Sequence, residues 1–150
     1  MRQVDVAIIG GGPAGLAAAV ELWKKGVRNL VILEREKQLG GILRQCIHDG
    51  FGLRRFKETL SGPEYAQRFI DLVQELGIPY ITEATVIRIT EDKQVYAAAP
   101  KGMVEIQAKA VILTMGCRER TRGAISIPGN RPAGVYTAGT AQAYINLYNK

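Results

Sequence analysis

The sequence predicts an α/β domain, in which helices flank a parallel sheet and an antiparallel β-meander forms part of the crossover. Residues 4–34 follow a strand, turn, helix, strand pattern, which is typical of a βαβ unit. Three short apolar runs lie between residues 85 and 108 and are separated by short polar turns, as in a meander. These two patterns define the fold class.

The βαβ unit ends its first strand in a glycine-rich turn. Val4–Ile9 is a short apolar run, and Gly10-Gly11-Gly12-Pro13-Ala14-Gly15 follows it directly. An apolar helical segment over residues 14–25 comes next, and a second apolar run, Leu30–Leu33, leads into Glu34. A strand, glycine turn, helix, strand and acid in this order predict a dinucleotide site.

Each residue type in this pattern has a physical reason. Gly10 permits the tight turn, Gly12 lets a diphosphate approach the backbone, and Gly15 lets the helix pack closely on the strand. The first N–H groups of a helix have no partners inside it, and the helix dipole adds partial positive charge there. Glu34 lies about 20 residues beyond the glycines, where a carboxylate bonds ribose hydroxyls. The alternative, a glycine-rich turn without a ligand, is disfavoured by this context.

A second glycine pair, Gly40-Gly41, lies just past this acid. It indicates another close approach of the backbone to a ligand, or a plain turn. Residues 44–60 show no regular period and predict an irregular loop, and such loops often carry function.

One more helix, the meander and a last helix are predicted further along the chain. Ser61 and Glu64 have capping-box spacing at the start of a helix that Gly77 ends. The run at residues 110–115 is apolar and is typical of a buried parallel strand. Strands are predicted over residues 78–82, 85–90, 94–98, 104–108, 110–115 and 135–138, and the last helix over residues 140–148.

Composition and charge are those of an ordinary globular protein. The 150 residues are 47% hydrophobic and 23% charged, with a net charge of +6. The basic residues are scattered with little aromatic interleaving, so nucleic-acid binding is not indicated. Arg118, Arg120 and Arg122 belong to a solvated surface or help to hold an anionic cofactor. No apolar run approaches the roughly 18 residues of a membrane span.

Several of these motifs together resemble the FAD-binding half of the two-dinucleotide-domain flavoprotein family, which includes thioredoxin reductase and the pyridine nucleotide–disulfide oxidoreductases. They are Gly10–Gly15, Glu34-Arg35, Gly40-Gly41 and Val111–Gly116. Residues 116–139 are more specifically similar to the FAD/NAD-binding subunits of opine oxidase, sarcosine oxidase alpha and hydrogen cyanide synthase. They also resemble an oxidoreductase associated with glycerol-3-phosphate dehydrogenase. The resemblance covers essentially the whole chain.

The resemblance implies where FAD would bind. The pyrophosphate would lie on the glycine turn, the adenosine ribose on Glu34, and the adenine beside Arg35 and the backbone of Val86. The implied cofactor-binding residues are Gly10, Gly12, Pro13, Ala14, Gly15, Glu34, Arg35, Gly40, Gly41, Arg44, Val86, Thr114, Gly116 and Arg118.

The resemblance also implies more chain than these residues. Relatives continue into an NAD(P)-binding domain and then return to complete the FAD domain, so residues 1–150 are expected to be the N-terminal part of a Rossmann-like FAD-binding domain. The implied parent enzyme moves a hydride between NAD(P)H and FAD and passes electrons to a substrate or to a partner dehydrogenase or oxidase subunit. The 150-residue chain alone is expected to be inactive.

Two alternatives stay open for the ligand and the activity. A non-catalytic module would hold ADP or FAD without turnover. Glu34 suits the ribose of NAD as well as that of FAD, whereas the meander and the Gly40-Gly41 pair favour FAD.

The two cysteines, Cys46 and Cys117, form no CxxC or metal-ligand pattern, so neither a metal site nor a disulfide framework is expected. The cytoplasm is then the default location. Cys46 lies two residues before His48, and an imidazolium lowers the pKa of a nearby thiol. Cys46 is therefore a candidate reactive thiol and His48 a candidate proton donor near a flavin. A buried or idle cysteine is the alternative.

Overall fold

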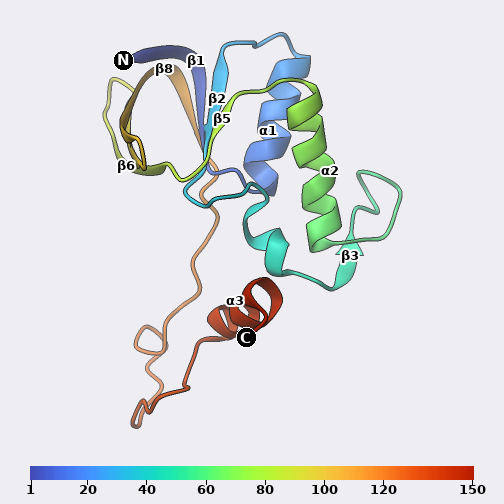
Figure 1. The fold of residues 1–150 in the computed structure, drawn as a ribbon, viewed down its shortest axis with the longest axis vertical. Helices are drawn as coiled ribbons and strands as arrows, with labels where there is room; N and C mark the ends of the chain where they lie inside the picture. Colours follow the sequence, from blue (N-terminus) through green and yellow to red (C-terminus); the bar gives the residue numbers. More distant parts are fainter.

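The computed structural model describes residues 1–150 as one six-stranded sheet whose parallel part has two helices on one face, while its antiparallel part, the meander, curls over the other face (Figure 1). The sheet strands are β1 (Arg2–Ile9), β2 (Leu30–Leu33), β5 (Tyr80–Ile81), β6 (Thr85–Ile89), β7 (Gln94–Ala99) and β8 (Gly102–Leu113). The other elements are α1 (Pro13–Lys24), η1 (Gly41–Gln45, a 3₁₀ helix), β3 (Asp49–Phe51), β4 (Leu60–Ser61), α2 (Gly62–Glu75) and α3 (Ala138–Tyr148).

The strand order is β5-β2-β1-β8-β7-β6. β5, β2, β1 and β8 run parallel, whereas β8, β7 and β6 pair in antiparallel fashion. The structure therefore confirms the predicted parallel sheet with an antiparallel meander.

β1 and β2 are buried on both of their faces. Ile8 and Ile32 belong to the apolar cluster under α1 and α2, whereas Ala7 and Val31 belong to the cluster under the meander. All four side chains are fully excluded from solvent. Because successive side chains point to opposite faces of a strand, only a continuous apolar run can fill both clusters. The two strands form a rigid base for the turns that follow them.

The helix α2 begins as the capping-box spacing predicts. The backbone N–H of Ser61 donates to Oε2 of Glu64 over 2.8 Å, and the Ser61 hydroxyl donates to the same oxygen. These two hydrogen bonds hold the pKa of the Glu64 carboxyl below its usual 4.5. Phe69, which is 3% exposed, then anchors the helix in the cluster that it shares with α1.

Two strands were predicted over residues 104–108 and 110–115, but one strand, β8, covers Gly102–Leu113, and Thr114 and Met115 lie beyond its end. β8 pairs with β7 along its first half, from Gly102 to Gln107, and with β1 from Ile106 to Leu113. The strand changes partner at Ile106–Gln107 without a turn, and it continues through Lys109 on the side of β1. The predicted burial is also wrong at the end of β8, where Leu113 is 58% exposed. Residues Ala110 to Leu113 of β8 pair with β1 on one side and have no strand on the other.

Two other segments also differ from prediction. The strand predicted over residues 135–138 is wrong: Val135 and Tyr136 are exposed coil, because no strand lies beside them to accept their hydrogen bonds. Residues 44–60, predicted to be irregular, contain the end of η1 and the β3–β4 hairpin, in which Asp49 pairs with Ser61. Its strands are too short to show an alternating pattern.

Candidate functional site at the carboxyl ends of the parallel strands

Three central parallel strands end side by side. Ile9 of β1 lies in register with Leu33 of β2 and with Leu113 of β8. The next residue of each strand, Gly10, Glu34 or Thr114, therefore lies at the same edge of the sheet. Open α/β sheets bind their ligands at this edge.

The carboxylate of Glu34 faces the glycine turn and is 6% exposed. Its Oε2 accepts the backbone N–H of Gly11 over 2.6 Å, and its Oε1 accepts that of Glu36 over 2.9 Å. Each carboxylate oxygen can accept a second hydrogen bond. Glu34 thus supports the turn and keeps acceptor capacity for a hydroxyl group.

Gly10 and Gly15 are glycines for reasons of packing. A Cβ on Gly15 would lie 1.9 Å from the carbonyl oxygen of Gly10, and Gly10 itself has a φ of +109°. The hydroxyl of Thr114 lies 2.9 Å from the carbonyl oxygens of Ile9 and Gly10, to which it can donate its proton. The predicted close approach of helix and strand is present, and Thr114 fixes the turn.

Gly12 is different, because the protein itself does not require a glycine there. Its φ is −78°, and a Cβ would meet only the Cα of Gly41, at 3.8 Å. Its backbone N–H donates to no group of the protein. Beside it, Pro13 begins α1, whose first turn leaves the N–H groups of Ala14 and Gly15 without helical partners. The open space beside Gly12 and the free N–H groups of Gly12, Ala14 and Gly15 together form a site that we call the glycine cradle. A side chain at position 12 would fill it, and it fits a diphosphate.

The second glycine pair lies against this cradle. The N–H of Gly40 donates to the carbonyl oxygen of Gly11 over 2.8 Å. Gly41 has a φ of +56°, and a Cβ on it would lie 2.9 Å from the Cα of Gly12. The two glycine segments are therefore packed backbone to backbone, which brings η1 next to the N-terminus of α1.

Arg35 and Val86 lie on the side of Glu34 that borders the meander. Arg35 is exposed and pairs with Glu36 over 3.3 Å, from Nε to Oε1. The N–H of Ala84 donates to the carbonyl oxygen of Glu34 over 2.9 Å, and half-buried Val86 follows two residues later at the start of β6. The structure thus brings both residues to the neighbourhood of Glu34.

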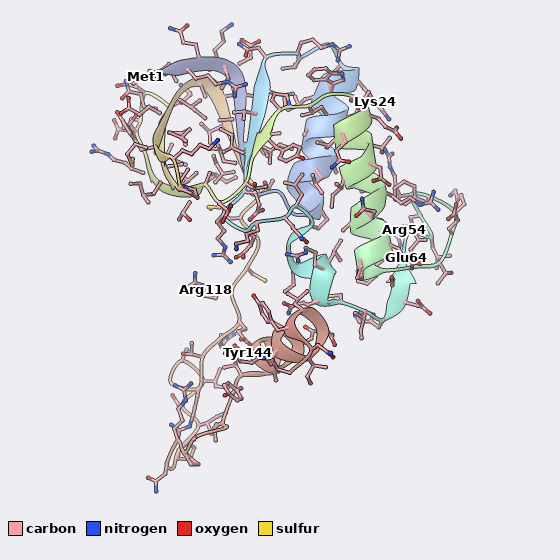
Figure 2. All side chains as sticks on the ribbon, viewed as in Figure 1. Met1, Lys24, Arg54, Glu64, Arg118 and Tyr144 are labelled. Carbon is pink, nitrogen blue, oxygen red and sulfur yellow. The ribbon has the colours of Figure 1, made fainter.

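The other predicted residues lie further from the glycine cradle or on a segment without regular structure. The aliphatic part of Arg44 packs near Gly40 and Ala66, where it lines a hollow against α2. Gly116, with a φ of +69°, and Arg118 are exposed beyond the end of β8. Figure 2 shows Arg118 on the segment that leads away from the sheet, with Tyr144 on the neighbouring α3.

Cys46 and His48 lie beyond η1, toward the hairpin. The Sγ of Cys46 lies 3.4 Å from the carbonyl oxygen of Ile42. The exposed His48 places Nδ1 3.0 Å from the carbonyl oxygen of Asp49, and its ring lies 5.3 Å from that of Phe51. Neither contact joins the two residues to each other or to the glycine cradle.

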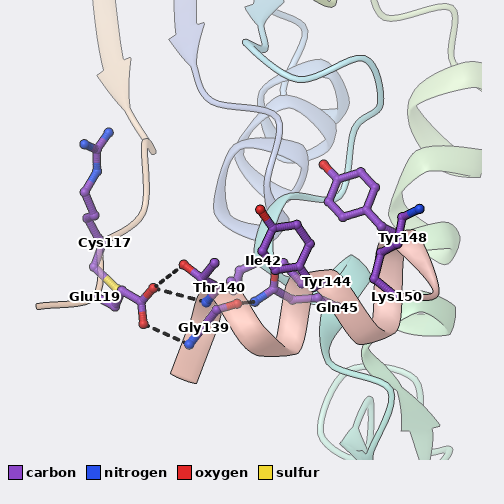
Figure 3. Close-up of a pocket in the computed structure, with 11 residues that line it drawn as sticks. Ile42, Gln45, Cys117, Glu119, Gly139, Thr140, Tyr144, Tyr148 and Lys150 are labelled. Carbon is purple, nitrogen blue, oxygen red and sulfur yellow. Dashed lines mark hydrogen bonds between the residues drawn. The ribbon is translucent and has the colours of Figure 1, made fainter. Parts of the chain in front are cut away.

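Sequence reasoning missed two residues that shape the same edge. Glu119 and Gln45 both hydrogen-bond to α3 and line a hollow of about 700 Å³ between η1, the end of β8 and α3 (Figure 3). Glu119 is the single acid in a basic run, and it precedes a helix start that lacks an acid of its own. That combination was the available signal for Glu119, whereas nothing in the sequence distinguishes Gln45.

The structure contains no cluster of three or more His, Cys, Asp or Glu side chains that could hold a metal ion. None of its helices combines the length and the apolar character needed to cross a bilayer. Both cysteines are free thiols.

Comparison with known proteins finds a relative that aligns with nearly the whole chain. One of the subunits of opine oxidase from Agrobacterium tumefaciens (strain Ach5) is 35% identical over 150 residues, which cover 92% of this chain and 28% of that protein. The chain thus spans little more than a quarter of that relative's length.

Solved structures of oxidoreductases match the fold. L-proline dehydrogenase from P. horikoshii has a TM-score of 0.77 and 25% identity, over 97% of this chain and 28% of that one. Thioredoxin reductase from Streptococcus pyogenes MGAS5005 has a TM-score of 0.62 and 25% identity, over 79% of this chain and 37% of that one. The family model for pyridine nucleotide-disulphide oxidoreductases matches residues 4–144, and the chain therefore belongs to that family of oxidoreductases.

Proposed function

We propose that residues 1–150 form the FAD-binding part of an oxidoreductase that moves a hydride between NAD(P)H and FAD. The observation that carries this proposal is the cradle at Gly12, where neither packing nor backbone conformation requires a glycine. A ligand that approaches the backbone closely supplies the missing reason. Membership of the oxidoreductase family supports a redox role for that ligand.

In this proposal the chain binds and orients the cofactor. The N–H groups of Gly12, Ala14 and Gly15 would hold the diphosphate, since Pro13 has none to offer. The free acceptor sites of Glu34 would take the ribose hydroxyls of the adenosine, with Arg35 and the backbone of Val86 near the adenine. The flavin would supply the hydride chemistry, and the protein its placement.

We further propose that additional chain completes this domain. The last residues of β8, from Ala110 to Leu113, pair with β1 on one side and have no strand on the other, and Leu113 is exposed. The chain also spans only 28% of the matching opine oxidase protein. An NAD(P)-binding domain and a returning segment of the FAD domain would account for the difference, and the 150-residue chain alone would bind FAD without turnover.

We also propose that the complete protein works with a partner dehydrogenase or oxidase subunit. The support is that the opine oxidase protein similar to this chain is named as one of the subunits of its enzyme.

The free thiols of Cys46 and Cys117 favour a cytoplasmic location.

The direct test is reconstitution of the chain with FAD. The chain is mixed with excess FAD, separated by gel filtration and examined for flavin absorbance that co-elutes with the protein and is shifted from that of free FAD. The same experiment with NAD separates an FAD domain from an NAD domain. Absence of bound flavin, both from this chain and from the longer protein that contains it, contradicts the proposal.

A further inference from the structure

The helix α3 is capped from a distance by Glu119. Its Oε2 accepts the backbone N–H of Gly139 over 2.8 Å, and its Oε1 accepts the N–H and the hydroxyl of Thr140, each over 3.2 Å. The hydroxyl of Thr137 also donates to Oε1. One carboxylate therefore satisfies the start of a helix that begins 19 residues later along the chain (Figure 3).

The helix has no such cap of its own. Thr137 stands at the N-cap, but its hydroxyl donates to Glu119 instead of accepting a helical N–H, and the first turn contains no acidic residue. A negative charge at this end also complements the helix dipole. The hydrogen bonds from Thr137 and from the backbone of Gly139 hold the pKa of the Glu119 carboxyl below its usual value, so the carboxylate is ionised at neutral pH.

Gln45 of η1 attaches the other side of α3. Its Nε2 lies 2.9 Å from Oε1 of Gln142 and 3.5 Å from the carbonyl oxygen of Gly139. In return, Nδ2 of Asn146 donates to the carbonyl oxygen of Gln45 over 2.7 Å. No residue of α3 is fully buried, and these polar contacts are part of what holds the helix in place.

The two attachment points of α3 belong to η1 and to the segment that follows β8. Gln45 ends η1, which begins at Gly41 against the Cα of Gly12. Glu119 follows the loop 116–118, which leaves the end of β8 and makes no regular structure. α3 therefore joins η1 to the loop 116–118 across the hollow that they share with it (Figure 3).

We propose that Glu119 is a positioning residue, which acts through α3 to hold the loop 116–118 at a fixed distance from η1. The inference rests on the FAD site proposed above and extends it. ADP ends at the diphosphate and would use only the first turn of α1 and Glu34. FAD continues past the diphosphate, so its ribityl and flavin groups would depend on η1 and the loop 116–118, which α3 joins.

The test compares FAD and ADP affinities of the full chain and of three variants. Glu119→Gln removes the charge and one acceptor, and Glu91→Gln is the control, because Glu91 is exposed and makes no hydrogen bond or ion pair. We expect Glu119→Gln to weaken FAD binding about fivefold and to leave ADP binding unchanged. Gln142→Ala, which removes the acceptor for Gln45, is expected to act in the same direction and leaves the helix intact.

The outcomes separate this inference from the proposed function. If the unmodified chain binds ADP and FAD but Glu119→Gln and Gln142→Ala bind FAD as it does, the positioning role is overturned. An equal loss of ADP and FAD affinity in these two variants overturns it as well, because the effect is then on the whole fold. If neither the unmodified chain nor the longer protein that contains it binds either nucleotide, the proposed FAD function is what fails.

Discussion

Glu34 and Gly11 are joined by a 2.6 Å hydrogen bond from the backbone N–H of the glycine to Oε2 of the acid. The bond spans 23 residues and connects the end of β2 to the turn after β1. The acid that was predicted to receive a ribose therefore also holds the glycine turn in shape. Because both roles use the same carboxylate, one substitution should affect both.

Glu34→Gln is expected to lower both stability and nucleotide affinity. The side-chain oxygen of glutamine can accept one of the two backbone N–H groups, of Gly11 and Glu36. The N–H₂ group of glutamine then faces the other N–H and leaves it without an acceptor. The free energy of unfolding should fall by about 1–3 kcal/mol, as for a buried donor left without an acceptor. Urea unfolding measures this loss, with the exposed and unpaired Glu91→Gln as the control. Unchanged stability would show that the two hydrogen bonds contribute little.

Gly12→Ala is expected to reduce FAD affinity while it leaves the fold intact. The new Cβ would make only an ordinary contact with Gly41, but it would occupy the space in which the diphosphate is expected. Alanine is a poorer N-cap than glycine but restricts the unfolded chain, so the two effects on stability offset each other. Gly123→Ala, where a Cβ meets nothing within 4 Å, is the control for FAD titrations. Equal FAD affinity in the two variants would remove the main argument for the cradle.

Gly15→Ala tests the packing role of the third glycine. Its Cβ would collide with the carbonyl oxygen of Gly10 at 1.9 Å and with Oγ1 of Thr114 at 2.8 Å. Relieving this overlap requires α1 to move away from β1, which should cost about 3 kcal/mol or more. Thermal unfolding measures the loss, with Gly123→Ala again as the control. A variant as stable as the parent would mean that α1 does not pack as the structure shows.

The attachment of α3 is expected to depend on pH with a defined sign. The pKa of Glu119 in the folded chain lies below its ordinary value of 4.5, mainly because Thr137 and Gly139 donate hydrogen bonds to it. Its contribution is therefore fully present above pH 4.5 and is lost as the pH falls through the lowered value. The amide proton shift of Gly139, followed by NMR, should titrate with a midpoint below 4.5, and this titration should vanish in Glu119→Gln. A midpoint at or above 4.5 would show that Glu119 does not accept these hydrogen bonds in solution.

The central part of the fold could be predicted because its physical causes are local. The Gly10–Gly15 turn, the apolar runs of β1 and β2 and the Ser61–Glu64 capping box each specify a structure within a few residues. The parallel pairing of β1 with β2 then follows from the βαβ connection. The glycine cradle and Glu34 also lie together in the structure, as the spacing along the chain predicts.

The remaining differences come from contacts between distant residues. β8 continues through Lys109 because it exchanges one partner strand for another, and no local pattern encodes that change. Val135 and Tyr136 have strand-forming side chains but no strand beside them, so propensity alone gave the wrong answer. The hydrogen bond between Glu119 and Gly139 joins residues 20 positions apart. The segment between them has no regular structure, so sequence spacing carries little information there.

An NMR titration of the ¹⁵N-labelled chain with ADP tests the central claim most directly. The largest amide shift changes are predicted at Gly11, Gly12, Ala14 and Gly15 and at the residues next to Glu34, and Gly12→Ala is predicted to abolish them. Saturating ADP that leaves these amides unchanged, or that moves only signals of α3 and the hairpin, would contradict a dinucleotide site at the start of α1.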